Sequence, residues 1–486
     1  MAAVTTTELR AGPRQWLGLA VLALPTLLLA LDITVLHLAV PHLSADLRPS
    51  GSQLLWIVDI YGFMIAGFLV TMGTLGDRVG RRRLLLIGAA AFGVASVLAA
   101  YATSPELLIA ARTALGVAGA TLMPSTLALI SNMFRDPGQR GVAIGIWATM
   151  FSVGVAIGPI VGGALLAAFW WGSVFLLGVP IMLLLLVAGP VLLPEFRDRA
   201  AGRPDLASVA LSLAAMLPIT FGIKELADPV VAVPAIVVGL VMGALFVRRQ
   251  RRLADPLLDL GLFGARAVRA ALVILLVATA TISGAYLFIT QYLQLVVGLS
   301  PLMAGLWLLP AATVLVMASM AAPLLARRFG AGRVVAVALV VSSAGFVVLT
   351  AADGLTTVVV GFVVAYSGIG PVFALGTDLV VGSADPAKAG AASALSETST
   401  ELGVSIGIAT LGSIGTAVYR AGSGGSDTLA EAVAAAEALP AAEGDALLRM
   451  AGDAFTAGLV TIAWVSAALL AAVAAVALVA LRDRVG

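Results

Sequence analysis

The chain has 486 residues, of which 61% are apolar and only 11% charged, and its mean hydropathy is +1.09. Soluble domains carry about 25% charged residues, so this composition excludes a soluble globular fold and indicates a protein that has a lipid bilayer as its solvent. The sequence contains no cysteine, which excludes disulfides and thiol chemistry.

A membrane-spanning helix needs about 20 mostly apolar residues, and the sequence contains about fourteen such segments. We therefore predict an all-α integral membrane protein. The polar residues at the N-terminus are followed at once by a full-length span, so we expect no cleavable signal peptide. The predicted spans centre near residues 27, 63, 92, 118, 154, 183, 215, 238, 281, 312, 342, 367, 402 and 468.

The basic residues predict the orientation of these spans, because cytoplasmic loops are enriched in Lys and Arg. If the N-terminus is cytoplasmic, the outer loops receive only Arg48, Lys224, Arg420 and Arg449, and Arg112 is left within a span. All other Lys and Arg then lie in inner loops or tails. We therefore expect both termini in the cytoplasm, which requires an even number of spans.

An internal echo divides the spans into two halves. The sequence GTLGDRVGRRR (73–83) links the second and third spans, and APLLARRFGAGR (322–333) links the tenth and eleventh. Aligning the two makes the ninth span equivalent to the first, so six spans repeat as six, with the seventh and eighth inserted. We expect an N-terminal tail (1–14), a six-helix bundle (15–195), the inserted helices (196–252), a linker (253–269) and a second six-helix bundle (270–482).

Two connecting segments have a composition of their own. The longest outer loop (418–454) is rich in Gly and Ser, then in Ala and acidic residues. It is expected to be a solvated helical hairpin or an irregular loop, or else a lid over an outer vestibule. The linker at 253–269 is amphipathic and is expected to lie along the inner membrane face.

The loop at 73–83 carries a specific arrangement of Gly and charge. Gly80 permits a backbone geometry that other residues avoid, and Asp77 can accept from a helix N-terminus or pair with an arginine. A basic loop that only fixes topology is one interpretation. The full spacing resembles the signature loop of the major facilitator superfamily, in which this charge cluster latches the inner gate. The resemblance implies that fold for the whole chain and a gating role for Gly73, Asp77, Arg78, Gly80 and Arg81; the echo has Ala326 in place of Asp77, so its latch is expected to be weaker.

The fifth predicted span has a glycine on every fourth residue. Gly154, Gly158 and Gly162 form a smooth face along which another backbone can pack, and Pro159 adds a kink. Helix packing alone would explain the glycines. The run GVAIGPIVGG (154–163) nevertheless resembles the antiporter motif of drug exporters in this superfamily.

Three further segments narrow the resemblance to one family within the superfamily. LDITVLHLAVP (31–41) resembles a first-span pattern of the fourteen-span drug:proton antiporter family, and WWGSVFLLGVP (170–180) and ALSETSTELG (394–403) resemble its subgroup exporting quaternary ammonium compounds, dyes and methyl viologen. His37 and Gly178 depart from the pattern, since asparagine is common there. Some members that take divalent cations carry an acid in the tenth span, and this chain has none between Pro301 and Arg327, which argues against efficient export of dications.

Three charged residues are expected to meet near the outer side. Acids inside apolar segments are costly and usually mark an ion or substrate path. Asp32, Asp59 and Arg112 each lie about six residues from the outer end of a span, or roughly 9 Å deep, and spans 1, 2 and 4 share one half-bundle in the superfamily. We expect a buried cluster in which the arginine holds one acid ionised and the other exchanges protons. A fully paired structural ion network is the alternative.

A second acidic pair lies in the thirteenth span. Ser393, Glu397, Glu401 and Ser405 are spaced by four, which places them on one helix face. At about 1.5 Å per residue, the two glutamates straddle the middle of a ~30 Å apolar core. Two carboxylates one turn apart repel, so each is a candidate proton carrier or partner of a cationic drug; a hydrogen bond to a neighbouring helix is the alternative.

Aromatic residues supply the remaining candidates, because aromatic faces attract organic cations. Core packing is an equal alternative for them. His37 and His42 do not share a helix face, so no metal site is expected. The aromatic candidates for the substrate cavity are Tyr61, Phe151, Tyr286, Phe288 and Tyr292.

The resemblance and the buried acids together predict a proton-coupled antiporter that exports lipophilic organic cations across the cytoplasmic membrane, works as a monomer, and needs no cofactor and no nucleic acid. Export of a specific neutral or anionic antibiotic is the alternative. An uptake transporter is disfavoured by the antiporter-type glycine motif. A membrane-embedded enzyme or receptor would need a nucleophile–base pair or a metal triad, which two histidines and no cysteine do not supply.

Overall fold

A computed structural model describes residues 11–197, 205–225, 228–253, 256, 260–382 and 389–481, and this part of the chain is helical with no strand. Fourteen helical segments in it are long and apolar enough to cross a membrane, which confirms the expected number. The helices are α1 (Pro13–Leu47), α2 (Gly51–Val79), α3 (Arg81–Ala100), α4 (Pro105–Met133), α5 (Pro137–Ala168), α6 (Ser173–Leu176), α7 (Gly178–Leu192), α8 (Leu206–Lys224), α9 (Pro229–Gln250), η1 (Leu260–Gly264), α10 (Arg266–Gln291), η2 (Tyr292–Val296), α11 (Pro301–Phe329), α12 (Ala331–Leu349), α13 (Leu355–Gly382), α14 (Ala389–Gly422), α15 (Leu429–Glu437) and α16 (Ala441–Ala480).

The internal echo in the sequence corresponds to a structural repeat. Helices α2 and α11 both begin after a serine, Ser50 or Ser300, whose hydroxyl accepts a hydrogen bond from the backbone N–H three residues later. Both end at a glycine with positive φ, 120° at Gly80 and 84° at Gly330. Such backbone angles favour glycine, so the same helix–turn–helix is built twice.

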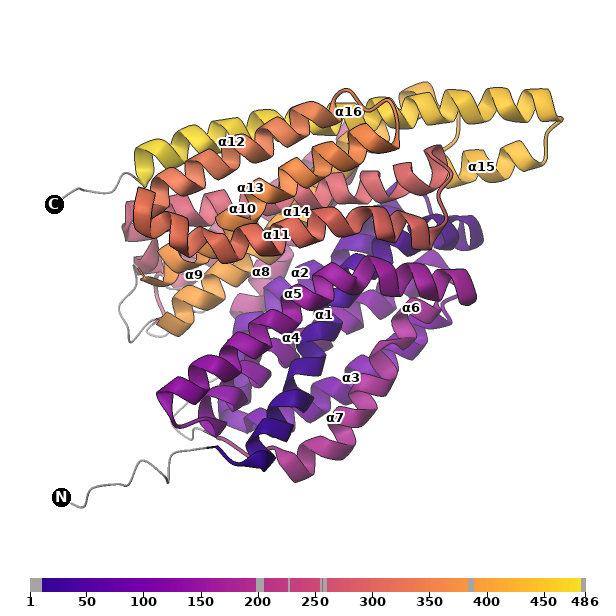
Figure 1. The fold of residues 1–486 in the computed structure, drawn as a ribbon. Coiled ribbons are helices and arrows are strands. Elements are labelled where there is room, and N and C mark those ends of the chain that lie inside the picture. Colours follow the sequence, from indigo (N-terminus) through magenta and orange to yellow (C-terminus); the bar gives the residue numbers. More distant parts are fainter. Residues whose placement is uncertain are drawn as a thin grey trace, which may run out of the picture.

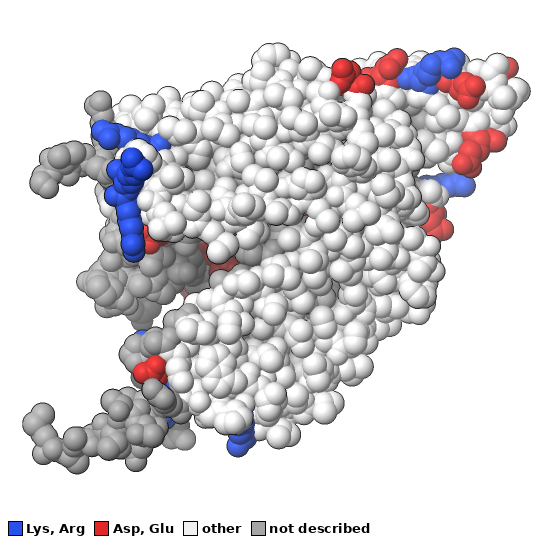
Figure 2. Space-filling view, viewed as in Figure 1, with Lys and Arg blue, Asp and Glu red and all other residues white. Residues whose placement is uncertain are grey.

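The helices form two bundles, α1–α7 and α10–α16, which meet at one end and diverge at the other (Figure 1). Helix α1 starts and helix α16 ends at the diverging end (Figure 1). We call this end the terminal face and the opposite end the distal face. Figure 2 shows a hollow between the bundles that opens at the terminal face and has acidic side chains in its depth.

Close contacts near the distal face hold the two bundles together. A methyl group added at Gly163 of α5 would lie 2.5 Å from the Cα of Leu302 in α11, and one added at Gly412 of α14 would lie 2.7 Å from Leu55 of α2. The bundles therefore touch with little more than backbone between them on this side. The structure is closed distally and open to the terminal face.

The inserted helices α8 and α9 form a hairpin beside the bundles. Helix α8 contacts both α2 and α14, whereas α9 packs mainly on α8. In the most apolar window of α9 only 11% of the residues are buried, so this helix presents its surface to lipid. Asp205 caps α8 by accepting from the N–H of Ser208 and pairs with Arg249 at 2.8 Å, which ties the two helices together at the terminal face.

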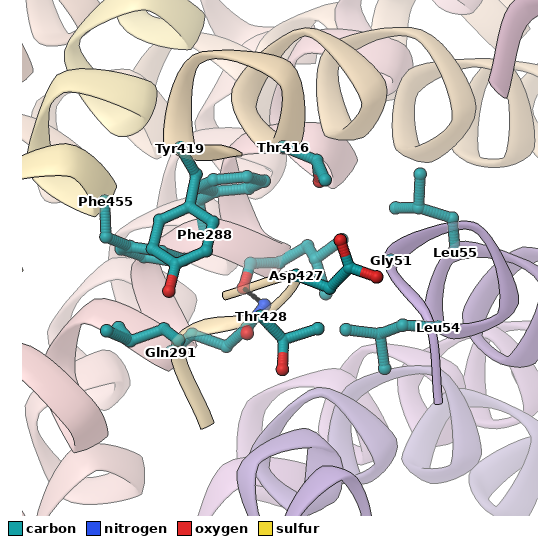
Figure 3. A pocket seen from close by; sticks show the side chains of 12 residues that line it. Gly51, Leu54, Leu55, Phe288, Gln291, Thr416, Tyr419, Asp427, Thr428 and Phe455 are labelled. Carbon is teal, nitrogen blue, oxygen red and sulfur yellow. Dashed lines mark hydrogen bonds between the residues drawn. The ribbon is translucent and has the colours of Figure 1, made fainter. Parts of the chain in front are cut away.

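The loop at 418–454 is largely helical and packs on the distal closure. It contains the end of α14, all of α15, which contacts α1, and the start of α16. Figure 3 shows Asp427 and Thr428, just before α15, beside a small pocket between Gly51 and Leu54 of α2 and the aromatic side chains of the second bundle. Helix α15 and the start of α16 thus form a largely exposed helical hairpin, which was one of the expected alternatives, and the residues just before α15 lie at the junction of the bundles.

The linker and the tail are described only in part. Residues 260–264 form η1, and α10 already begins at Arg266, inside the segment expected to be a linker. Residues 1–10 of the expected tail, most of residues 254–259 and the side chain of Ser393 lie outside the described part of the chain.

Candidate functional site

Asp32 and Arg112 form an ion pair in the first bundle. The distance from Arg112 Nη1 to Asp32 Oδ2 is 2.7 Å, and the two side chains are 2% and 10% exposed. The same guanidinium donates to the backbone carbonyls of Ile57 (3.1 Å) and Val58 (3.3 Å) in α2. Its Cζ atom lies 4.6 Å from the ring centroid of Tyr61. Arg112 therefore joins α1, α2 and α4, as the expected cluster of spans 1, 2 and 4 requires.

The second acid of the cluster has a partner that the sequence analysis assigned elsewhere. Lys224, expected in an outer loop, lies in the last turn of α8, and its Nζ is 2.8 Å and 3.0 Å from the two carboxylate oxygens of Asp59. Both side chains are fully buried. The expected outer-loop position is wrong, because α8 continues to Lys224 and leans against α2. The cluster contains two carboxylates and two cations, so neither Asp32 nor Asp59 is left without a cation, as one of them was expected to be.

Helix α14 brings its glutamates to the same place. A methyl group added at Gly62 of α2 would lie 2.5 Å from Ser405 Oγ and 3.8 Å from Glu401 Oε2. Glu401 lines one small cavity together with Asp59 and Arg112. The volume of this cavity is about 20 Å³. It can hold water but no drug. The sequence predicted two separate acidic sites, and the structure joins them.

Glu397 lies one helical turn from Glu401 on the same face of α14, toward the terminal face. Both glutamates are half-buried. Among the ion pairs of the described residues, none involves either glutamate. Of the acids that meet at this site, the two on α14 therefore have no matching cation, whereas Asp32 and Asp59 are paired.

The aromatic candidates are divided between the site and the core. Tyr61 faces Arg112 and lines the small cavity, and the ring of Tyr286 lies 5.0 Å from that of His37, which lines it as well. Tyr292 is 4% exposed, within the packed core. In this conformation its position fits the packing alternative. Phe151 is half-buried in α5, and Phe288 stacks on Phe455 with ring centroids 4.8 Å apart.

The glycine face of α5 packs directly on α1. A methyl group at Gly154 would lie 2.6 Å from the carbonyl oxygen of Leu27, one at Gly158 would overlap Thr34 Oγ1, and one at Gly162 would lie 2.8 Å from Val35. Pro159, on the adjoining part of the helix, contacts Gly305 of α11. Helix α5 therefore links the Asp32-bearing helix of the first bundle to the second bundle.

The signature loop is an ion-paired junction at the terminal face. Asp77 accepts from Arg81 Nε at 2.7 Å and forms an ion pair with its Nη2 at 2.6 Å. Glu195, which follows α7, accepts from the backbone N–H of Arg82 at 3.1 Å and would be 2.6 Å from a methyl group at Gly80. The pairing of Asp77 with an arginine was expected. Gly73 packs loosely against Pro124, 3.9 Å from an added methyl group, and Arg78 is exposed.

Three functional neighbours were missed by sequence reasoning. Lys224 was expected in an outer loop, yet its Nζ lies 3.6 Å from the ring centroid of Trp56 in α2. Glu195 was not singled out at all. The one available signal was that a lysine is rare in this arginine-rich chain and ends an apolar stretch.

Comparison with known proteins places the chain in a family. The model of the Major Facilitator Superfamily matches residues 22–408. The chain is 47% identical over 98% of both lengths to the "Multidrug efflux pump LfrA" of Mycolicibacterium smegmatis, and 36% identical to the "Methyl viologen resistance protein SmvA" of Salmonella typhimurium, covering 91% of this chain and 93% of that protein. Its fold matches a bacterial homolog of the human lysosomal transporter Spinster, in an inward-facing and unoccupied conformation, with a TM-score of 0.68 at 16% identity over 98% of this chain and 100% of that one. The chain therefore belongs to the major facilitator superfamily and is a multi-pass membrane transporter, not an enzyme.

Proposed function

We propose that this transporter exports lipophilic organic cations across the cytoplasmic membrane in exchange for protons, as a monomer with both termini in the cytoplasm. The observation that carries the proposal is the uncompensated carboxylate pair, Glu397 and Glu401, at the junction of the two bundles. Carboxylates kept inside a membrane without a cation are costly. A site that alternately holds a proton and a cationic substrate accounts for that cost.

Competition for the same carboxylates couples the transport of the substrate to the transport of protons. With the hollow open to the cytoplasm, a cationic substrate pairs with the ionised glutamates and displaces their protons. When the distal face opens, protons from outside neutralise the carboxylates, and the substrate loses its counter-charge and leaves. Return of the protonated site to the cytoplasm completes the cycle. Because two ligands exclude each other at one site, the proton gradient alone drives export.

Three observations support this assignment. The basic loops lie at the terminal face, and by the positive-inside rule this supports a hollow that opens to the cytoplasm. Asp32 and Asp59 of the first bundle already have cations, which leaves the pair on α14 for exchange. One of the two relatives compared is named as a multidrug efflux pump, and the other is named for resistance to methyl viologen, an organic cation.

Ethidium transport in proteoliposomes tests the proposal. The wild-type protein should move ethidium against its gradient when a pH gradient is imposed. In the Glu397→Gln/Glu401→Gln double variant this flux should be at least about tenfold lower, because the loss of one ion pair of about 1.4 kcal/mol corresponds to a factor of ten. Glu443→Gln, at an exposed acid near the start of α16, is the matched control and should transport normally.

Two results would count against it. Wild-type flux in the double variant would remove Glu397 and Glu401 from the site. Failure of ethidium and other organic cations to compete, together with competition by neutral or anionic antibiotics, would favour the alternative of an exporter for a specific antibiotic.

A further inference from the structure

The ammonium group of Lys224 lies in a complete site for an organic cation. Both oxygens of Asp59 lie within ion-pair distance of it, at 2.8 Å and 3.0 Å, and the ring centroid of Trp56 lies 3.6 Å away. A carboxylate next to an aromatic face is the arrangement that recognises organic ammonium groups. The site is made by α2, and its occupant comes from an inserted helix, so the chain fills a cation site of the first bundle with its own side chain.

This filled site continues the line of acids on α14. Helices α2 and α14 run in opposite directions and meet at Gly62, which is close to both Glu401 and Ser405. The hydroxyl of Ser405 lies 3.5 Å from the backbone carbonyl oxygen of Asp59, so Asp59 is level with Ser405. Four helical residues rise about 6 Å. Glu397, Glu401 and Asp59 therefore form three successive steps from the hollow toward the distal face.

Glu401, which has no cation among the described residues, lines the same small cavity as Asp59, together with His37 and Arg112. Two other charged groups near Asp59 have partners of their own. Arg112 pairs with Asp32 and donates to two backbone carbonyls of α2. Glu225, next to Lys224, accepts a hydrogen bond from Ser52 Oγ at 2.8 Å, which anchors the end of α8 on α2. This anchor fixes the position from which Lys224 reaches its partner.

We infer that Lys224 determines the charge selectivity of the transporter, as a tethered cation that keeps Asp59 from receiving a positive charge of the substrate. This inference rests on the proposed export of organic cations. A fixed charge acts twice as strongly on a dication as on a monocation, so the ammonium disfavours dications over monocations. The same preference was expected from the absence of an acid in the tenth span.

Competitive binding to the purified full-length transporter tests the inference. Ethidium, with one positive charge, is followed by its fluorescence and displaced by methyl viologen, which has two. Lys224→Gln should raise the affinity for methyl viologen relative to ethidium by about tenfold at pH 8.5, the effect of one ion pair of about 1.4 kcal/mol. The gain should be smaller at pH 6.5, where Asp59 without its cation takes up a proton more readily.

Two further variants keep the test decisive if Lys224→Gln folds poorly. Asp59→Asn leaves the ammonium uncompensated and should shift the preference the opposite way, toward ethidium. The double variant Lys224→Gln/Asp59→Asn has no net change of charge and should return to the wild-type ratio. Arg449→Gln, which removes an exposed cation of α16, is the matched control and should leave the ratio unchanged.

The inference is overturned if the single variants bind ethidium but keep the wild-type ratio within twofold, or if the double variant keeps the shift of Lys224→Gln. Failure of the proposed function looks different. In that case the wild-type protein itself does not bind ethidium.

Discussion

At the scale of single residues, the buried charges are of two kinds. Asp32 and Asp59 each have a cation within 3.0 Å, whereas Glu397 and Glu401 have none among the described residues. A buried pair stays charged, because removing either partner leaves an uncompensated charge. A lone carboxylate in apolar surroundings avoids that cost by binding a proton. On this difference rests our proposal that protons exchange on α14 and that the paired acids have a structural role.

Asp32→Asn tests the structural role. The substitution leaves the Arg112 guanidinium buried without its counter-charge, so we expect the free energy of unfolding to fall by about 3–5 kcal/mol. Thermal unfolding of the purified protein in detergent measures the loss. The double variant Asp32→Asn/Arg112→Gln should recover part of it, because no buried charge is left alone. If the double variant is less stable than the single one by the full effect of Arg112→Gln alone, the two residues are not coupled.

At the scale of helices, the contact of α1 with α5 depends on the absence of side chains. Gly154→Ala would place a methyl group 2.6 Å from the carbonyl oxygen of Leu27. Because the two backbones must move apart, we expect a loss of about 1–3 kcal/mol in stability, measured by thermal unfolding, together with slower transport.

The same helix provides the control. A methyl group at Gly145 would meet no atom within 4 Å, so Gly145→Ala should be harmless. Alanine has the higher helix propensity, so helix propensity cannot explain a loss. Equal losses from the two substitutions would show that the effect does not come from the close contact between α5 and α1.

The ion pair that ties α8 to α9 predicts how the stability of the protein depends on pH. Burial raises the pKa of Asp205, but hydrogen bonds from Arg249 and Ser208 outweigh it and hold this pKa below its ordinary value. The folded protein is therefore stabilised above the ordinary aspartate pKa of about 3.9, and this contribution is lost as the pH falls through the lower, folded value. Asp205→Asn should lower the unfolding temperature at pH 7, with a difference from wild type that shrinks below about pH 4; a difference that does not depend on pH would contradict this explanation.

The helices could be predicted from the sequence because each span satisfies its own backbone hydrogen bonds and needs only length and apolarity. The glycine turn at Gly80 and its echo at Gly330 were also readable, since their backbone angles favour one residue type. The position of Lys224 was not readable. A lysine at the end of a span and a lysine in a loop give the same sequence pattern. Only the packing of α8 against α2 shows which of the two positions Lys224 has.

At the scale of the whole molecule, the same limit applies to the site. Asp32, Asp59, Arg112, Glu397 and Glu401 could be selected because charge is rare in apolar segments. That Asp59, Arg112 and Glu401 line one cavity depends on how the two bundles are docked at Gly62 and Ser405, which no local pattern specifies. The site was thus predicted as a set of residues but not as one constellation.

A reversible lock on the distal face tests the movement that transport requires. A methyl group at Gly51 would lie 3.0 Å from Thr416 Cγ2, across the two bundles, which is compatible with the 3.5–4.5 Å between the Cβ atoms of a disulfide. The chain has no cysteine of its own. Oxidation of a Gly51→Cys/Thr416→Cys variant should stop ethidium transport, and a reductant should restore it.

The single-cysteine variants serve as controls and should transport under both conditions. Transport at the wild-type rate with the disulfide fully formed would mean that the distal face does not open between α2 and α14.

Proton release on substrate binding tests the central claim most directly. Ethidium is added to the purified protein in weakly buffered detergent solution, and a pH indicator records the protons set free. We predict that the wild-type protein releases protons in proportion to the ethidium bound and that the Glu397→Gln/Glu401→Gln variant releases none, whereas Asp32→Asn still does. Ethidium binding to the wild-type protein without proton release, at any pH between 6 and 8, would contradict the claim that proton and substrate exchange at these carboxylates.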